Sequence, residues 1–122
     1  MTTDELKKQL YAALSKSAAL VPLVGSHIYH LQAPAGASSR VPYLVYSVIS
    51  DVPILSGDDA EYQSAVTMRI HIVVDTGSDY GKIYAVTNPL MIGLGYMRYQ
   101  CNEIIDDGHI VYVTDYKIGV DA

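Results

Sequence analysis

The residues that could perform chemistry are few in this 122-residue chain, and they lie far apart in the sequence. Nucleophilic catalysis requires a Ser, Cys or Thr beside a base and an orienting group. The single cysteine, Cys101, stands where Met97, Tyr99 and Cys101 alternate with polar residues. We therefore expect it on the core face of a strand, where a cysteine behaves as a small hydrophobe rather than as a nucleophile. The sequence also lacks a G-x-S-x-G motif, so nucleophilic catalysis is not predicted.

The four histidines do not form a metal-binding pattern. His27 and His30 are three residues apart, a spacing that on a strand points the two side chains to opposite faces. His71 and His109 are single residues on the polar faces of predicted strands, where a solvated or interface position is the simpler interpretation. Because metal sites need clustered ligands, no metal site is predicted.

Paired carboxylates occur at Asp58–Asp59 and at Asp106–Asp107, each pair beside a glycine. Asp is favoured in such turns because its side chain bonds its own backbone, whereas acid–base catalysis needs carboxylates that converge across a cleft. Gly93-Leu94-Gly95 follows a predicted helix, so it is expected to end that helix rather than to bind phosphate. With a net charge of -5 and only eight Lys and Arg, the sequence does not predict a basic surface for binding nucleic acid. We predict a protein that is not an enzyme and holds no cofactor.

Two amphipathic helices are predicted from the spacing of apolar residues. The first spans residues 4–16 and begins at a capping box formed by Thr2 and Glu5. The second spans about 79–93, with apolar residues at helical spacing. Pro89 interrupts the second pattern, and we expect it to kink the helix or to restart it.

Strands are predicted where β-branched and aromatic residues are concentrated. The expected strands are 27–31, 43–50, 61–75, 97–102 and 109–118, with a hairpin signal at Asp106-Asp107-Gly108 and a short helical turn at 18–23. In 61–75 the even positions from Val66 to Val74 are apolar, which predicts one face in the core and one face wet or in an interface. The predicted fold class is α+β: a mainly antiparallel four-stranded sheet, plus a short extra strand, with two amphipathic helices on one face.

Length and composition predict a single domain over residues 1–122. Half of the residues are hydrophobic, and eleven Tyr occur with no Trp and no Phe. Tyr suits half-buried sites and interfaces because its ring packs while its hydroxyl stays hydrated. The acidic N-terminal residues do not resemble a signal peptide, and no apolar run approaches the ~20 residues that span a bilayer. We expect a soluble component of an assembly that does not contact membranes.

One predicted loop, residues 51–60, carries a run of apolar residues. Val52, Pro53, Ile54 and Leu55 follow one another there. Loops run over the surface, and exposed apolar residues in them often mark a contact with a partner. The sequence leaves a second interpretation equally open, in which this segment folds back onto its own core.

Four passages, taken in order, resemble a family of bacteriophage tail-completion (tail-terminator) proteins long catalogued as a domain of unknown function. They are Leu23-Val24-Gly25 followed by His27-Ile28-Tyr29, then Ala33-Pro34 leading to Pro42-Tyr43-Leu44-Val45-Tyr46, then Arg69-Ile70-His71-Ile72 ahead of a helix, and finally Ile105-Asp106-Asp107-Gly108 running into Asp115-Tyr116-Lys117-Ile118. The resemblance covers residues 5–120. Each passage is unspecific by itself, and their order and spacing carry the resemblance.

The resemblance implies a structural subunit that forms a ring, commonly a hexamer, at the head-proximal end of the tail tube. Its expected partners are further copies of itself, the tail tube protein and a head-closure or connector protein, and DNA would pass through without specific binding. The expected location is the neck of the virion, after assembly in the host cytoplasm. A closed ring needs heterologous interfaces. Candidate contacts are the segment from Val52 to Leu55 and the loop from Pro34 to Arg40.

Two other functions remain open at this point. The chain could be another neck protein, such as a head-closure component, and the partner that it binds would separate these two roles. It could instead be a small cellular α+β module that binds a ligand for regulation. That module should have a concave apolar pocket with a few convergent polar groups.

Overall fold

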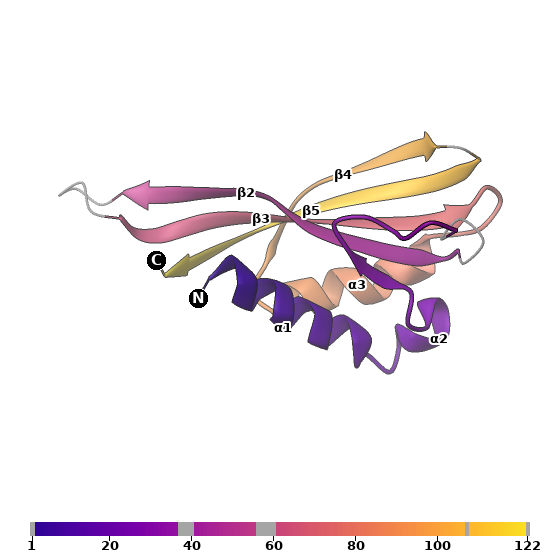
Figure 1. Cartoon of the computed structure of the whole chain (residues 1–122), viewed down its shortest axis with the longest axis horizontal. Coiled ribbons are helices and arrows are strands. Elements are labelled where there is room, and N and C mark those ends of the chain that lie inside the picture. Colours follow the sequence, from indigo (N-terminus) through magenta and orange to yellow (C-terminus); the bar gives the residue numbers. More distant parts are fainter. Residues whose placement is uncertain (1, 37–40, 56–60, 107, 122) are drawn as a thin grey trace.

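Five strands form one sheet, with α1 and α3 against one side of it and α2 beside α1 (Figure 1). The structure is a computed structural model, and it describes residues 2–36, 41–55, 61–106 and 108–121. The helices are α1 (Thr3–Ser15), α2 (Val21–Val24) and α3 (Gly81–Gly93), and the strands are β1 (Ile28–His30), β2 (Tyr43–Leu55), β3 (Glu61–Asp75), β4 (Met97–Asp106) and β5 (His109–Asp121). The predicted α+β class is confirmed.

The sheet is mixed, with the strand order β1-β2-β3-β5-β4. β1 pairs in parallel with β2, and the other three pairs are antiparallel. The predicted four antiparallel strands are present, but the short strand β1 joins them in a five-stranded mixed sheet, and α2 is a third helix. A strand of three residues carries too little pattern for the sequence to give its pairing direction.

Helix α1 begins where the capping box predicts. The Glu5 amide donates to the Thr2 hydroxyl over 3.2 Å, and the Glu5 carboxylate accepts from the Thr2 amide over 3.3 Å. These two bonds satisfy amides that have no partner within the helix. Leu6, Leu10 and Leu14 recur at four-residue spacing and are fully buried, so one stripe of α1 covers the sheet.

Helix α3 passes through Pro89 without a break between Gly81 and Gly93. The predicted restart is therefore wrong. Pro89 is exposed, whereas Thr87 and Met91 on the buried side are packed in the core. Packing of that side against the sheet holds the helix together although the proline removes one backbone hydrogen bond. Among the described residues, no helix is long and apolar enough to cross a membrane.

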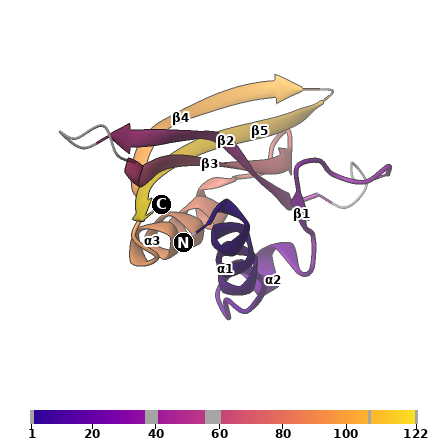
Figure 2. The ribbon, with the colours of Figure 1, turned by 60° about the vertical axis from the view of Figure 1, so that its left-hand side comes forward.

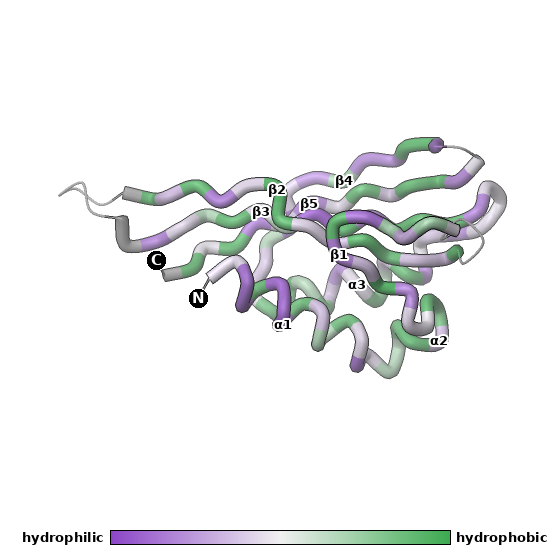
Figure 3. Tube along the Cα trace, viewed as in Figure 1, coloured by the Kyte–Doolittle hydropathy of each residue, from purple (hydrophilic) through white to green (hydrophobic). Residues whose placement is uncertain are grey.

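The core lies between the helices and the side of the sheet that faces them (Figure 2). The alternation predicted for residues 61–75 is confirmed on this side, because the even positions from Val66 to Val74 are all buried. Figure 3 shows hydrophobic and hydrophilic residues alternating along the strands. The other side is called the outer face here. Thr67 and Val73 on that face are also buried, since β3 is a central strand and the side chains of β2 and β5 flank it.

Strand β2 is longer than predicted, because it continues to Leu55 instead of ending near residue 50. The expected loop at 51–60 is therefore wrong for residues 51–55. Pro53 suggests a loop, but a proline is tolerated in an edge strand, where its missing N–H can face away from the neighbouring strand. β2 is such an edge beyond Tyr46, where its pairing with β1 ends.

The hairpin predicted at Asp106-Asp107-Gly108 is confirmed, since β4 ends at Asp106 and β5 starts at His109. Gly108 has a φ of 79°, a left-handed conformation that glycine adopts without steric cost. Asp107 itself lies outside the described residues. β5 pairs with β3 from His109 to Asp121, so it is also longer than the predicted strand 109–118.

Candidate subunit interface

The apolar segment of β2 lies in a long β2–β3 hairpin that extends past the helices, at the left of Figure 1. The side chain of Val52 is 55% exposed and that of Ile54 is 44% exposed. Pro53 is exposed as well, and only the backbone of Leu55 is described. The exposure of Val52, Pro53 and Ile54 contradicts the interpretation in which the segment folds back onto the core. An interface role for these residues remains a prediction.

A β-bulge decides which way these side chains point. The pairing of β2 with β3 shifts between Val48 and Ser50, so Ile49 is an extra residue and the alternation reverses after it. Val52 and Ile54 consequently pair with Ala65 and Gln63, which belong to the outer face. The hairpin thus presents its two exposed branched side chains on the side of the sheet away from the helices.

Pro34 lies at a different place, beside β1. It is exposed and contributes to an open hollow of about 430 Å³. The hollow is lined by aromatic and small residues from α1, β1, β2 and the segment after β1: Tyr11, Ile28, Tyr29, His30, Gln32, Ala33, Pro34 and Tyr46. Arg40 lies outside the described residues. The predicted contact segments are therefore at separate positions, one next to β1 and one at the far end of β2.

Strand β4 is the surface that the sequence analysis missed. Nine of its ten residues are exposed, including four large hydrophobic side chains: Met97, Tyr99, Ile104 and Ile105. The prediction that Met97, Tyr99 and Cys101 lie on a core face is wrong for the first two, and Cys101 is only half-buried. Alternation indicates that a strand has two faces, but it does not show whether a helix covers either face. Here α3 packs under β5, and β4 lies farther out as the edge of the sheet (Figure 2).

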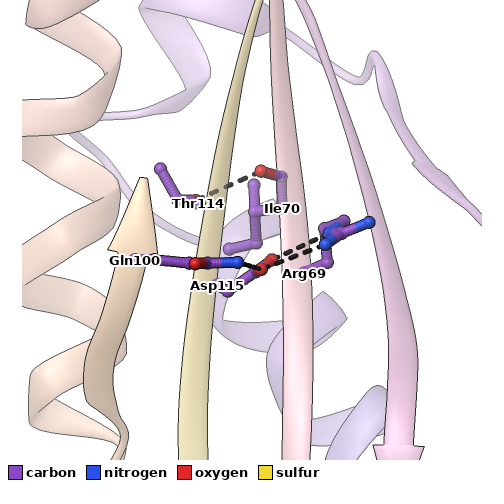
Figure 4. A network of polar contacts seen from close by, with 5 residues as sticks. All are labelled: Arg69, Ile70, Gln100, Thr114 and Asp115. Carbon is purple, nitrogen blue, oxygen red and sulfur yellow. Dashed lines mark hydrogen bonds and ion pairs between the residues drawn. The ribbon is translucent and has the colours of Figure 1, made fainter. Parts of the chain in front are cut away.

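A polar cluster on the outer face joins β4 to the two central strands (Figure 4). Arg69 on β3 donates to the Asp115 carboxylate on β5 through Nε over 2.8 Å and through Nη2 over 3.1 Å. Gln100 on β4 donates its side-chain amide to the same carboxylate over 3.1 Å. Asp115 is 1% exposed, so it is a buried carboxylate with charged and neutral donors on both sides. The cluster fixes the position of the edge strand.

The surroundings of Asp115 also change its acidity. Burial by itself raises the pKa of the Asp115 carboxyl, but the hydrogen bonds from Arg69 and Gln100 outweigh burial and hold that pKa below its usual value. The neighbouring His71 is half-buried, and burial together with the Arg69 charge lowers the pKa of its imidazole. Both shifts favour a charged Asp115 and a neutral His71 at neutral pH. This is the state expected of a structural cluster.

Tyrosines connect α3 to β5 and β4 on the other side of the sheet. The Tyr80 ring stacks on the Tyr112 ring with centroids 4.3 Å apart, and Tyr84 meets Tyr112 edge-on at 5.3 Å. The Tyr80 hydroxyl donates to the Glu103 carboxylate, and the Arg98 guanidinium donates to the Tyr84 hydroxyl over 2.8 Å. The bond to Glu103 is the main reason that the pKa of Tyr80 rises to about 12. The hydroxyls that a phenylalanine would lack therefore tie the edge strand to the helix.

The described residues contain no group of three or more His, Cys, Asp or Glu placed to hold a metal ion. His30 is exposed and lies against the Tyr46 ring, with centroids 5.2 Å apart. The structure offers protein-binding features instead: exposed branched and aromatic residues on two strands, both at the edges of the sheet. Exposed apolar edges of this kind are candidates for contacts between protein chains.

These features describe a small α+β domain whose edge strands carry exposed apolar side chains. Comparison with known families identifies the group: the model of the tail completion protein gp17 family matches residues 8–97, and the chain belongs to this family. A search of curated proteins finds no match. Among solved structures, a chain from the virion of a native gene transfer agent (GTA) particle has a similar fold, with a TM-score of 0.64 at 13% identity, covering 93% of this chain and 92% of that chain.

Proposed function

We propose that this protein is the subunit that ends the tail tube of a long-tailed phage and joins the tail to the head. The family match over residues 8–97 carries the proposal. In this role the protein acts by binding other proteins, without catalysis, metal or cofactor. Its place is the neck of the virion, and assembly occurs in the host cytoplasm.

The proposed assembly is a ring around the DNA path, with six copies as the expected number. A ring closes only when two different patches of one subunit meet across each contact. The exposed apolar residues of β2 and of β4 are two such patches, because the two strands lie toward opposite edges of the sheet. A patch used with itself would give a dimer instead.

The charge of the chain suits a ring through which DNA moves. The net charge is -5, so the average field of the subunit repels the phosphate backbone. A duplex would then pass without being held. The tail tube protein would contact one side of the ring and a head-closure or connector protein the other.

Disruption of the gene in its phage or prophage tests this function. Without a protein that ends the tube, tails should continue to grow, and electron microscopy should show overlong tubes separate from DNA-filled heads. Tails of normal length beside heads that lose their DNA would instead assign the protein to head closure. Normal joined particles would contradict any role in the neck. Expression of the gene from a plasmid should restore normal particles and serves as the control.

A further inference from the structure

The sheet has two free edges, and both carry exposed apolar side chains. β1 covers β2 only from Leu44 to Tyr46, so the described part of β2 from Ser47 to Leu55 pairs on one side only. β4 forms the other end of the sheet and pairs only with β5. Of the eleven exposed large hydrophobic residues in the described chain, seven lie on these two strands: Ile49, Val52, Ile54, Met97, Tyr99, Ile104 and Ile105.

Uncovered edge strands with apolar side chains are uncommon, because their free N–H and C=O groups pair readily with other chains. The two free edges also have nearly equal length, nine residues of β2 and ten of β4. At about 3.4 Å per residue each edge extends roughly 30 Å. Two edges of matching length at opposite sides of one sheet suit each other as partners.

We propose that the free edge of β2 in one copy pairs with β4 of the next copy, so that the sheets of all subunits join into one continuous sheet around the ring. The occupant of each edge is thus a second copy of this chain. The inference rests on the proposed ring and specifies its contact. Main-chain hydrogen bonds would supply much of that contact, as in other cases of strand addition.

Strand direction agrees with this arrangement. β2, β3, β5 and β4 alternate in direction, so β2 and β4 of one copy run opposite ways. Rotation about an axis roughly along the strands leaves these directions unchanged. The β4 strand of the next copy is therefore antiparallel to β2, and the alternation continues across the contact. Antiparallel pairing is also slightly more stable per residue than parallel pairing.

Charge agrees as well. At the described end of the β2–β3 hairpin, Asp51 lies on β2 and Glu61 of β3 pairs with Leu55, and the described residues 50–55 and 61–66 include no basic one. Antiparallel pairing brings this end of β2 to the beginning of the neighbour's β4, where Arg98 lies and where Lys117 pairs with Met97. The acidic residues of β4, Glu103 and Asp106, then meet the uncharged beginning of the free edge at residues 47–50. Parallel pairing would place the acidic ends of both strands together, and like charges oppose such a contact.

Apolar residues match in the same orientation. Val52 and Ile54 are on the outer face near the end of β2, and Met97 and Tyr99 are near the beginning of β4. Met97 pairs with Lys117, and the Lys117 ammonium lies 3.9 Å from the centre of the Tyr99 ring. The antiparallel contact would therefore bring Val52 (55% exposed) and Ile54 (44% exposed) against Met97 and Tyr99 of the next copy. Met97 is 74% exposed and Tyr99 is 57% exposed.

Crosslinking of engineered cysteines tests the contact, in a Cys101→Ser background that removes the native thiol. The test variant combines Ile54→Cys with Met97→Cys. The matched control combines Ile54→Cys with Ile104→Cys, because Ile104 is also exposed and pairs with Val111 at the opposite end of β4. Each variant is assembled with the tail tube protein of the same genome and treated with a short bismaleimide. The products are separated on a denaturing gel.

The test variant should give a ladder that ends at a closed ring, with roughly tenfold more crosslinking than the control, since a linker that cannot span two sites joins them hardly at all. The single variants should give no crosslinked species. Dimers from Met97→Cys alone would show that β4 pairs with itself and would overturn the inference. Equal crosslinking in test and control variants, or none, would also overturn it.

Microscopy of the wild-type mixture separates this inference from the proposed function. Rings on the tubes, combined with a crosslinking result that overturns the inference, would agree with the proposed function but contradict the β2–β4 contact. Absence of rings would contradict the function itself, and the inference with it.

Discussion

Three strands meet at one carboxylate on the outer face of the sheet. Asp115 accepts hydrogen bonds from Arg69 on β3 and from Gln100 on β4, and it is itself part of β5. Burial of a charge is costly unless partners satisfy it, and here both carboxylate oxygens have donors. The cluster is therefore important for stability and for the position of β4, which is the strand that we assign to the subunit contact.

Asp115→Ala should lower the free energy of unfolding by about 3 kcal/mol at pH 7, because it leaves the Arg69 guanidinium without its carboxylate. Arg69 is 33% exposed, so water compensates part of the loss and the lower end of the usual range applies. Urea denaturation measures this change. Asp51→Ala removes an exposed carboxylate and is the control. Equal losses in both variants would contradict a structural role for the cluster.

The stabilisation by Asp115 should depend on pH. The folded-state pKa is below the usual value of 3.8, so the carboxylate stabilises the folded protein above that value and loses its effect as pH falls toward the folded pKa. The stability difference between wild type and Asp115→Asn should stay constant from pH 7 to about 5 and shrink at lower pH. Denaturation of both proteins across this range measures it. A difference that grows on acidification would contradict the assignment.

At the scale of elements, the sequence pattern predicts those features that depend only on residues near one another along the chain. The capping box of Thr2 and Glu5, the leucine stripe of α1 and the alternation of β3 all follow from nearest neighbours along the chain. The full length of β2 and the exposure of β4 do not follow from neighbouring residues in the sequence. Both depend on which strand lies beside which, and the sequence pattern of Met97 and Tyr99 is the same whether or not a helix covers them.

The candidate interface likewise has features that the sequence predicts and features that it does not. Val52 and Ile54 were found because an apolar run in a predicted loop is unusual, and they are exposed although the segment is a strand. The face to which they point depends on the bulge at Ile49, and no residue type near Ile49 predicts a bulge there. Ile104 and Ile105 follow one another in sequence and so occupy both faces of β4. Such a pair in the sequence indicates apolar side chains on both faces of a strand, but not whether the strand is covered.

Pro89 gives a prediction about a single helix. The residue is exposed, and the helix continues through it, so Pro89→Ala should restore a backbone hydrogen bond and raise the free energy of unfolding by about 1–3 kcal/mol. Pro22→Ala is the control, because Pro22 lies in the first turn of α2, where a proline costs little. Thermal and urea denaturation measure both variants. A less stable Pro89→Ala protein would show that the proline is needed for the packing of α3.

At the scale of the whole molecule, the exposed hairpin should serve assembly rather than folding. Val52→Lys combined with Ile54→Lys should change the free energy of unfolding by less than about 0.5 kcal/mol for each substitution, because both side chains are about half exposed and lie outside the core. Assembly into rings should be lost, as measured by analytical ultracentrifugation and electron microscopy. Ile92→Lys on α3 is the matched control, since Ile92 is 53% exposed and lies away from both edges. Equal assembly of wild type, the double variant and Ile92→Lys would show that the hairpin is not part of the interface.

In the proposed assembly, copies of one α+β subunit form a ring at the end of the tail tube. Its parts agree with one another: two different apolar edges, an even number of antiparallel strands between them, and a negative net charge around a DNA path. The chain belongs to a family of tail completion proteins, which supports the proposed place of this assembly in the phage.

Electron microscopy of the purified protein mixed with polymerising tail tube protein from the same genome tests the central claim most directly. We expect tubes that stop growing after addition of the protein, each with a ring at one end only. Tubes that keep growing to the same length as without the protein, with bare ends, would contradict it.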